Sequence, residues 1–200
     1  MKVLLHICCA PCACYPVKVL QAEEFELFGY FFNPNIHPYA EFKKRRDTVQ
    51  VLADKMQLRV IYQEDYDVAE FFRNVAFREE QRCLFCYQRR LEASARLAKR
   101  GKFDYWTTTL LYSKQQKHDL IIQLAEESAK KIGVKFLYRD FREGWKEGIE
   151  KSHELGLYRQ QYCGCLLSER ERYLPRSKHV DKTDSPDDSP FEEPQPLVGP

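Results

Sequence analysis

With 200 residues and a hydrophobic share of 44%, the chain has the size and composition of one globular domain. It is long enough to bury a core without disulfide bonds. The sequence contains no apolar run of about 18 residues and does not begin with the basic and apolar regions of a secretory signal, so we expect neither a membrane span nor secretion. We therefore expect a cytoplasmic protein whose eight cysteines are not held in disulfides.

The formal net charge of +2 is unevenly distributed. Residues 178–200 contain two lysines and six acidic residues and so carry −4, which leaves +6 on residues 1–177. The same C-terminal segment contains five of the ten prolines and shows no apolar periodicity. We predict a single domain over 1–177 and a disordered, acidic, proline-rich tail over 178–200.

Apolar runs and helical spacing alternate along the chain. "KVLLHI" (2–7) is a short apolar run typical of a buried strand, Pro11 then suits the first turn of a helix, and Gly133 is a C-terminal stop for another helix. In chain order, the sequence predicts a strand over 2–7, a helix over 11–24, a strand over 25–33, a helix over 39–56, a strand over 58–63, helices over 66–76 and 84–100, a strand over 103–111, a helix over 117–133, a strand over 134–140 and a helix over 143–155.

Strands that alternate with helices indicate crossover connections and a mainly parallel sheet. The predicted fold class is therefore α/β, a three-layer Rossmann-like domain. Neither a GxGxxG motif nor a P-loop is visible, so we expect no nucleotide cofactor.

The eight cysteines fall into three groups. Four of them lie in "HICCAPCAC" (6–14), directly after the first predicted strand, and the others form "CLFC" (83–86) and "CGC" (163–165). Ligands of open parallel sheets collect at the carboxyl ends of the strands, and the first group lies at such an end. The other two groups lie in segments that could fold over the same edge, so we expect all three groups to converge there.

A disulfide knot, a metal site and a reactive thiol pair are the alternatives for these cysteines. Structural cysteines tend to lie singly in apolar runs, whereas "EEQRC" and "QQYC" have polar flanks. A structural zinc ion takes four thiolates, so two zinc sites would account for all eight cysteines, and an iron–sulfur cluster also takes four. The pattern favours metal binding, with iron–sulfur chemistry ahead of zinc.

Local geometry indicates how the cysteines are used. Neighbouring residues of an extended segment point to opposite sides, so Cys8 and Cys9 are expected to diverge and to serve different centres. Cys12 would lie in the first turn of a helix, whose positive end stabilises a thiolate. Gly164 allows a tight turn within "CGC", so its two sulfurs could also be shared between centres. Two neighbouring metal centres would use this arrangement.

Seven stretches together resemble the QueH-type epoxyqueuosine reductases. They are "LLHICCAPC" (4–12), "FNPNIHP" (32–38), "EFKKR" (41–45), "RCLFCYQRRLE" (82–92), "TTTLLYSKQQKHDLI" (107–121), "DFREGWKEG" (140–148) and "LYRQQYCGC" (157–165). The resemblance implies a fold similar to the adenine-nucleotide α-hydrolase-like group. It also implies an oxidoreductase that converts epoxyqueuosine to queuosine at the wobble position of tRNA, without cobalamin, using a [4Fe–4S] cluster beside a single metal ion, which we expect to be iron.

Carried over onto this sequence, the family's motifs imply cysteine ligands and one aspartate. The aspartate that we choose is Asp140, which ends the strand predicted over 134–140 and so faces the same edge as Cys8. Asp140 as an ordinary helix cap is the alternative, because "DFRE" fits a capping box. Cys14 lies outside the motif, and we expect it to be packed in the first helix. The implied cysteine ligands are Cys8, Cys9, Cys12, Cys83, Cys86, Cys163 and Cys165.

Removing an epoxide oxygen needs two electrons and two protons and releases water, so an external electron donor is required. Iron–sulfur clusters carry electrons one at a time, and a metal with an open position can polarise the epoxide oxygen as a Lewis acid. Asp140 and Cys12 are the catalytic candidates. We assign Cys83 and Cys86 to the cluster with one thiol each from Cys8/Cys9 and Cys163/Cys165, and the remaining thiols with Asp140 to the single metal. The candidate proton donors are His6, His37, Tyr112 and Tyr162.

The tRNA substrate also has to be bound. The basic stretches "KKRR" (43–46), "QRR" (88–90) and "RLAKRGK" (96–102) could contact phosphates. Tyr39 and Tyr87 lie close by and could stack on a splayed anticodon base. The alternative for each basic stretch is an ordinary solvated face of a helix.

Two rival functions fit parts of the sequence. An iron–sulfur tRNA thiolation enzyme on a related fold would need an ATP-binding loop after the first strand, where "CCAPCAC" stands instead. A zinc-stabilised RNA-binding module without catalysis would use the same cysteines. Visible absorption distinguishes the zinc module from an iron–sulfur enzyme, because an iron–sulfur protein is brown and a zinc protein is colourless.

Overall fold

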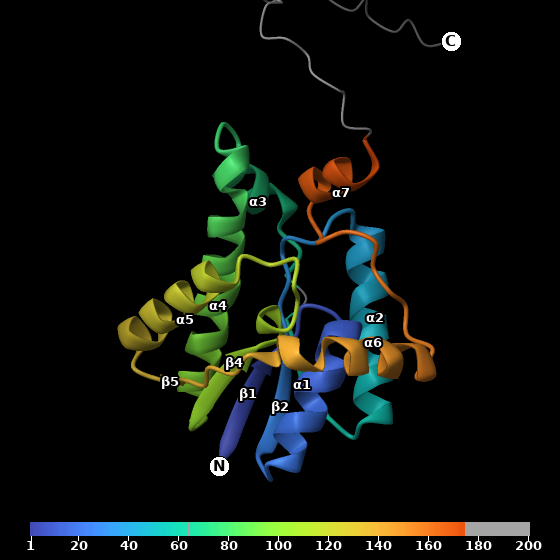
Figure 1. The fold of residues 1–200 in the computed structure, drawn as a ribbon. Coiled ribbons are helices and arrows are strands. Elements are labelled where there is room, and N and C mark those ends of the chain that lie inside the picture. The colour runs from blue at the N-terminus through green and yellow to red at the C-terminus, as the bar shows by residue number, and fades with distance from the viewer. Residues whose placement is uncertain (64, 175–200) are drawn as a thin grey trace, which may run out of the picture.

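Five strands in the described part of the chain form one parallel sheet (Figure 1). The structure is a computed structural model that describes residues 1–63 and 65–174. The strand order is β3-β2-β1-β4-β5, and every neighbouring pair is parallel, which confirms the predicted fold class. The strands are β1 (Lys2–His6), β2 (Glu26–Phe31), β3 (Arg59–Tyr62), β4 (Tyr105–Thr108) and β5 (Lys135–Phe136).

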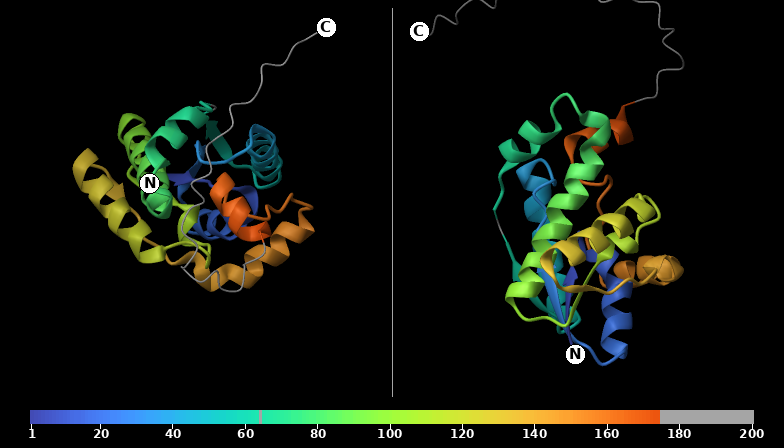
Figure 2. Two further views of the ribbon diagram at one scale, coloured as in Figure 1. Left: turned by 90° about the horizontal axis from the view of Figure 1, so that it is seen from above. Right: turned by 90° about the vertical axis from the view of Figure 1, so that its left-hand side faces the viewer.

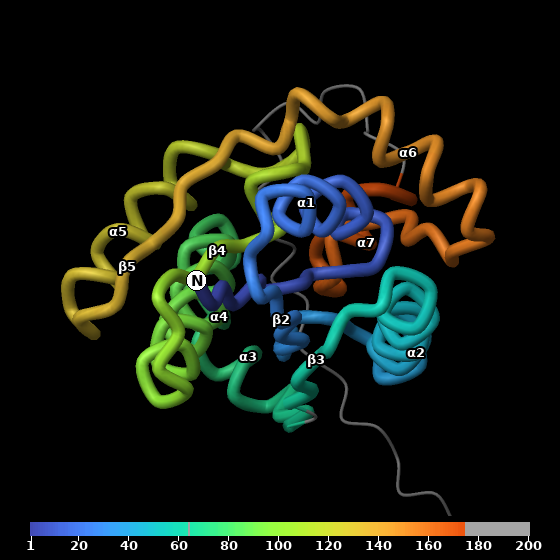
Figure 3. The backbone as a smooth tube through the Cα atoms, turned by 90° about the horizontal axis from the view of Figure 1, so that it is seen from below, coloured from blue at the N-terminus to red at the C-terminus, as the bar shows by residue number. Residues whose placement is uncertain are grey.

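Helices on both sides of the sheet complete a three-layer arrangement. The α-helices of the described residues are α1 (Ala10–Ala22), α2 (Tyr39–Lys55), α3 (Val68–Val75), α4 (Arg82–Arg100), α5 (His118–Ile132), α6 (Trp145–Glu154) and α7 (Leu166–Tyr173). Helix α1 packs against α2 and α6 on one side, and α4 packs against α3 and α5 on the other (Figure 3). Helix α7 lies above the carboxyl edge of the sheet (Figure 2).

The apolar pattern of the sequence explains the core. Val3, Leu4 and Leu5 of β1 are fully buried, because this central strand is covered on both faces. Leu52 of α2 is also fully buried, in line with its helical spacing. Helix α5 ends where Gly133 adopts a left-handed backbone conformation with φ of 73°, as predicted.

Several boundaries differ from the sequence prediction. Strand β4 ends at Thr108, whose side chain accepts a hydrogen bond from Leu110 N–H and begins the 3₁₀ helix η2 (Thr109–Leu111). Strand β5 is much shorter than 134–140, and Asp140 similarly begins η3 (Phe141–Gly144). In both places a side-chain oxygen binds a nearby backbone N–H and so competes with the strand ladder. Helix α7 and the short η1 (Glu79–Gln81) were not predicted.

The predicted tail over 178–200 and the predicted domain boundary at 177 lie outside the described residues. Within 1–63 and 65–174, no helix combines the length and the apolar character that crossing a membrane requires.

Candidate metal centre

A cavity of about 610 Å³ lies at the carboxyl edge of the sheet, where β1 and β4 are neighbours. The strand order reverses between these two strands, and the segments that follow them diverge, which leaves a crevice. Cys8, Cys9 and Cys12 line this cavity from the turn after β1, and Tyr112 lines it from the segment after β4. Cys163 reaches the same cavity from the segment before α7. We call it the switch-point cavity.

Three sulfur atoms meet in the turn after β1. The Sγ atoms of Cys8, Cys9 and Cys12 all lie within 4.8 Å of one another, and those of Cys8 and Cys9 are 3.8 Å apart. The expected divergence of Cys8 and Cys9 is therefore wrong. Strand β1 ends at His6, so strand alternation does not extend to these residues, and Cys9 already forms the N-cap position of α1. Three thiols this close could hold a metal ion.

The close approach of these three thiols, of which Cys9 and Cys12 are buried and Cys8 is half-buried, separates their pKa values. Hydrogen bonding with the thiols of Cys12 and Cys9 lowers the pKa of Cys8 well below its usual value. Burial raises the pKa of Cys9, and the hydrogen bonds to Cys8 and Cys9 raise the pKa of Cys12. The lowered pKa expected at Cys12 from the helix end is therefore not found there: among the three thiols, the pKa of Cys8 is lowered and that of Cys12 is raised.

The other four motif cysteines form a second, looser group. Cys83 and Cys86 lie in the first turns of α4 at positions i and i+3, which share one face of the helix. Burial, and then the neighbouring Cys163 and Cys165, raise the pKa of Cys83 and raise that of Cys86 to about 12. Cys165 is buried with Phe71 of α3. The structure thus brings "CLFC" and "CGC" into mutual electrostatic range, but less tightly than the three thiols after β1.

Four side chains direct donors at cysteine sulfur atoms. Such donors orient thiolate ligands and stabilise their charge. Sequence reasoning missed all four, although each lies within a stretch that carries the family resemblance. The pairs are Thr109 Oγ1 with Cys8 Sγ (3.2 Å), Gln160 Nε2 with Cys9 Sγ (2.8 Å), Arg90 Nη2 with Cys86 Sγ (3.0 Å) and Gln116 Nε2 with Cys163 Sγ (3.5 Å).

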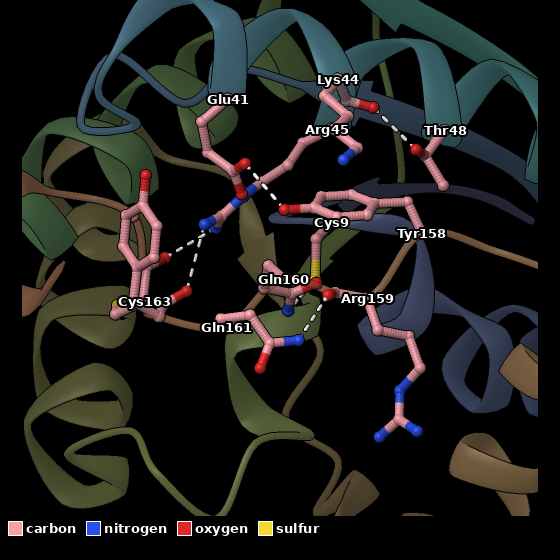
Figure 4. Close-up of polar contacts among 12 residues, drawn as sticks. Cys9, Glu41, Lys44, Arg45, Thr48, Tyr158, Arg159, Gln160, Gln161 and Cys163 are labelled. Atoms are coloured by element: carbon pink, nitrogen blue, oxygen red, sulfur yellow. Dashed lines mark hydrogen bonds and ion pairs between the residues drawn. The ribbon is translucent and has the colours of Figure 1, made fainter. Parts of the chain in front are cut away.

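The segment from Tyr158 to Cys163 is fixed to α2 by a buried ion pair (Figure 4). Arg45 Nε donates to Glu41 Oε1 at 2.7 Å, and Tyr158 donates to Glu41 Oε2 at 2.8 Å. The Arg45 guanidinium also donates to the carbonyl oxygens of Tyr162 (3.1 Å) and Cys163 (2.9 Å). These contacts hold the backbone on either side of Gln160, whose amide points at Cys9.

Asp140 does not line the switch-point cavity. One carboxylate oxygen accepts the backbone N–H of Arg142 at 3.0 Å, and both oxygens bind the Arg142 guanidinium at 2.8 and 2.6 Å. The hydrogen bonds from Arg142 lower the pKa of Asp140 to about 2. This is the cap geometry of the alternative reading, and the ligand role of Asp140 stays a prediction.

Cys14 is buried in the core and its thiol donates to the Ala10 carbonyl oxygen at 3.5 Å, within α1. Its place in the first helix, apart from the compact group of sulfurs, is as predicted. Burial raises its pKa to about 12, so the thiol keeps its proton. Nothing in these contacts links Cys14 to the cavity.

The four candidate proton donors differ in access to the cavity. His6 is buried, binds Thr108 Oγ1 at 2.9 Å, and has its pKa lowered to about 4 by burial, so it is neutral at pH 7. His37 is buried in ring contact with Phe71. Tyr112 and Tyr162 line the cavity, and burial raises the pKa of both phenols, so both hold their protons at neutral pH.

Three residues expected to contact tRNA are buried instead. Arg45 of "KKRR" is 3% exposed and Arg90 of "QRR" is 2% exposed, so neither can reach a phosphate. Tyr87 is 3% exposed and donates to Gln116 Oε1 at 2.8 Å, so it cannot stack on a base. Tyr39 is 57% exposed. The stretches 43–46 and 88–90 each put one arginine on the inner face of a helix, where only the tertiary contacts reveal a partner, whereas both arginines of 96–102 are exposed.

Comparison with known proteins identifies the family. The family model described as "Epoxyqueuosine reductase QueH" matches residues 3–171. The chain belongs to the QueH family of epoxyqueuosine reductases. The resemblance noted in the sequence is therefore confirmed, and the chain is an oxidoreductase of queuosine biosynthesis and tRNA processing. No comparison favours a thiolation enzyme or a zinc module.

Three curated relatives named epoxyqueuosine reductase QueH align over 70% or more of their own length. The protein of Dehalococcoides mccartyi is 39% identical, over 86% of this chain and 94% of its own. The protein of Thermotoga maritima is 35% identical, over 90% of this chain and 94% of its own. The Streptococcus pyogenes protein is 30% identical, over 84% of this chain and 70% of its own.

Proposed function

We propose that this chain removes the epoxide oxygen of epoxyqueuosine in tRNA, and that two cysteine-held metal centres beside the switch-point cavity carry the reaction. The observation behind this is the meeting of three close sulfurs after β1 with Cys163 of "CGC" at one cavity. We infer that the protein acts in the cytoplasm, where its eight unpaired thiols stay reduced.

The cysteine ligands fit the [4Fe–4S] cluster and the single metal ion that the resemblance implies. Seven motif cysteines lie in two sets, and four of their sulfurs accept side-chain hydrogen bonds that suit thiolates. The geometry supports a simpler division than the one predicted from sequence, with Cys8, Cys9 and Cys12 on the single metal. The [4Fe–4S] cluster would then be held by Cys83, Cys86, Cys163 and Cys165.

Three thiolates leave a coordination position for a further ligand or for substrate. When bound, the cluster supplies electrons singly, and the metal polarises an epoxide oxygen. The chain itself supplies the cavity, the donors that hold the sulfurs, and two protonated phenols, Tyr112 and Tyr162, at its wall. These phenols are our candidates for delivering a proton to the oxygen as the C–O bond breaks.

Anaerobic reconstitution with iron and sulfide tests this function. The protein is then incubated with epoxyqueuosine-containing tRNA and a chemical reductant, and the nucleosides are analysed by mass. Loss of one oxygen supports the reductase, and no loss from a brown, iron-loaded protein refutes it. A colourless protein that binds zinc and RNA alone would support the rival module.

Asp140→Ala separates the two readings of this residue. If Asp140 is a ligand, its carboxylate has to break the contacts with Arg142 to reach the metal. The substitution would then remove the single metal and the activity, while the visible absorption of the cluster stays. As a helix cap only, its loss lowers the free energy of unfolding by about 0.5–2 kcal/mol and leaves the metal content unchanged. Metal analysis and urea unfolding of one sample give the answer.

A further inference from the structure

Arg90 is a buried cation at the boundary between the two cysteine groups. It lies on α4, one turn after Cys86, is 2% exposed and lines the switch-point cavity. Its electrostatic neighbours include Cys86 and Cys163 of the looser group and Cys8 of the compact group. A guanidinium at this place acts on sulfurs of both groups.

The hydrogen bonds of Arg90 go to a sulfur, a backbone carbonyl and a side-chain amide. Its Nη2 donates to Cys86 Sγ at 3.0 Å, its Nε to the Cys86 carbonyl oxygen at 3.2 Å, and its Nη1 to Asn33 Oδ1 at 3.4 Å. No carboxylate of the described residues forms an ion pair with it. A guanidinium does not lose its proton in proteins, and burying an unpaired charge is costly.

Three other arginines of α4 are paired in the ordinary way. Each binds a glutamate and is more exposed than Arg90. These pairs are Arg82 with Glu171, Arg89 with Glu70 (3.1 Å) and Arg96 with Glu92. Arg90 is the one arginine of α4 that is buried, and the groups facing it that can supply negative charge are sulfurs.

We propose that Arg90 is the charge-compensating residue of the cluster, and that its fixed positive charge raises the cluster's reduction potential. This proposal rests on the proposed function. Reduction takes one electron from the donor and adds one negative charge to the thiolate-held group. A buried cation 3.0 Å from Cys86 Sγ stabilises that added charge, and its N–H bond to the sulfur acts in the same direction.

The test is a redox titration of the full-length, anaerobically reconstituted protein with dithionite, followed by visible absorption. Arg90→Met and Arg90→Gln remove the charge, and Arg90→Lys keeps it. Arg96→Met is the matched control on the same helix, because that side chain is 63% exposed and screened by water. Iron and sulfide content is measured on every sample first.

A neutral residue at position 90 should make reduction at a given potential at least about tenfold less favourable, which is a fall of about 59 mV for one electron. Arg90→Lys should lie between the neutral variants and the parent, and Arg96→Met should match the parent. Either neutral variant suffices if the other does not fold. A fully iron-loaded neutral variant with the parent's midpoint overturns the proposal.

The stability of the metal-free and cluster-bound forms gives a second test, because an arginine with a purely structural role would affect both forms equally. Without metal, Arg90→Met should unfold no more easily than the metal-free parent, because an unpaired buried charge has been removed. With the cluster bound, the same variant should release iron faster than the parent. Equal destabilisation in both forms overturns the proposal. If the parent protein itself binds no cluster, the proposed function fails, and the iron content measured before the titration shows this. If the parent binds the cluster, the titration tests the role of Arg90 alone.

Discussion

The ion pair of Glu41 and Arg45 gives a prediction whose size follows from its burial. The two side chains are 11% and 2% exposed, and the guanidinium also serves two backbone carbonyls of the segment that carries Gln160 and Cys163. Arg45→Met leaves the Glu41 charge without its cation, although Tyr158 still donates to it, and leaves both carbonyls without their donor. Breaking a buried pair in this way costs about 3–5 kcal/mol, a large part of the roughly 5–15 kcal/mol that stabilises a typical domain.

Urea unfolding followed by circular dichroism at pH 7, under reducing conditions, measures this loss. The control is Arg59→Met, which breaks an exposed pair with Glu26 at 3.0 Å, where the Arg59 side chain is 67% exposed. Exposed pairs contribute about 0–1 kcal/mol, so the control should change little. An Arg45→Met variant that loses no more than the control refutes the reasoning.

A double variant checks the cause. Glu41→Gln with Arg45→Met removes both charges, so no uncompensated carboxylate is left beside Tyr158. We expect this double variant to be more stable than Arg45→Met alone, because the orphaned charge dominates the loss. A double variant at least as unstable as the single one would instead assign the loss to the two carbonyls and to packing.

Three further predictions concern the site and its supports. Gly164→Ala should lower the free energy of unfolding by about 1–3 kcal/mol, because φ is 153° and the new Cβ would lie 3.0 Å from Asn35 Nδ2; an unchanged urea midpoint would contradict this. Cys14→Ala should keep the full metal content and lose about 1 kcal/mol of stability, so loss of iron on reconstitution would show that its thiol is not idle. Asp140 has its pKa lowered from 3.8 to about 2, so its contribution is fully present above about pH 3.8 and is lost as the pH falls through 2. Because the Asp140 side chain is 41% exposed, that contribution should be no more than about 1 kcal/mol, and acid unfolding of Asp140→Asn should differ from the parent by no more than this.

Local sequence patterns determined the fold class and the general position of the site. The buried run of β1, the alternation with helices and the stop at Gly133 depend on neighbours within a few residues, and these signals are visible in the chain itself. The three cysteine motifs and the stretches around them identified the family, because their combination is specific. That the first group follows a strand was enough to place it at the carboxyl edge.

The tertiary structure alone decided how the cysteines are grouped and what the arginines do. Cys8 and Cys9 converge because the strand has already ended at His6, a boundary that the apolar run did not mark. Arg45 is buried by a segment that lies more than 100 residues further along the chain, which the sequence did not show, so the stretch 43–46 was interpreted as a phosphate contact or a solvated face. Sequence periodicity reports which residues share a face of a helix, but which distant segment covers that face depends on long-range packing.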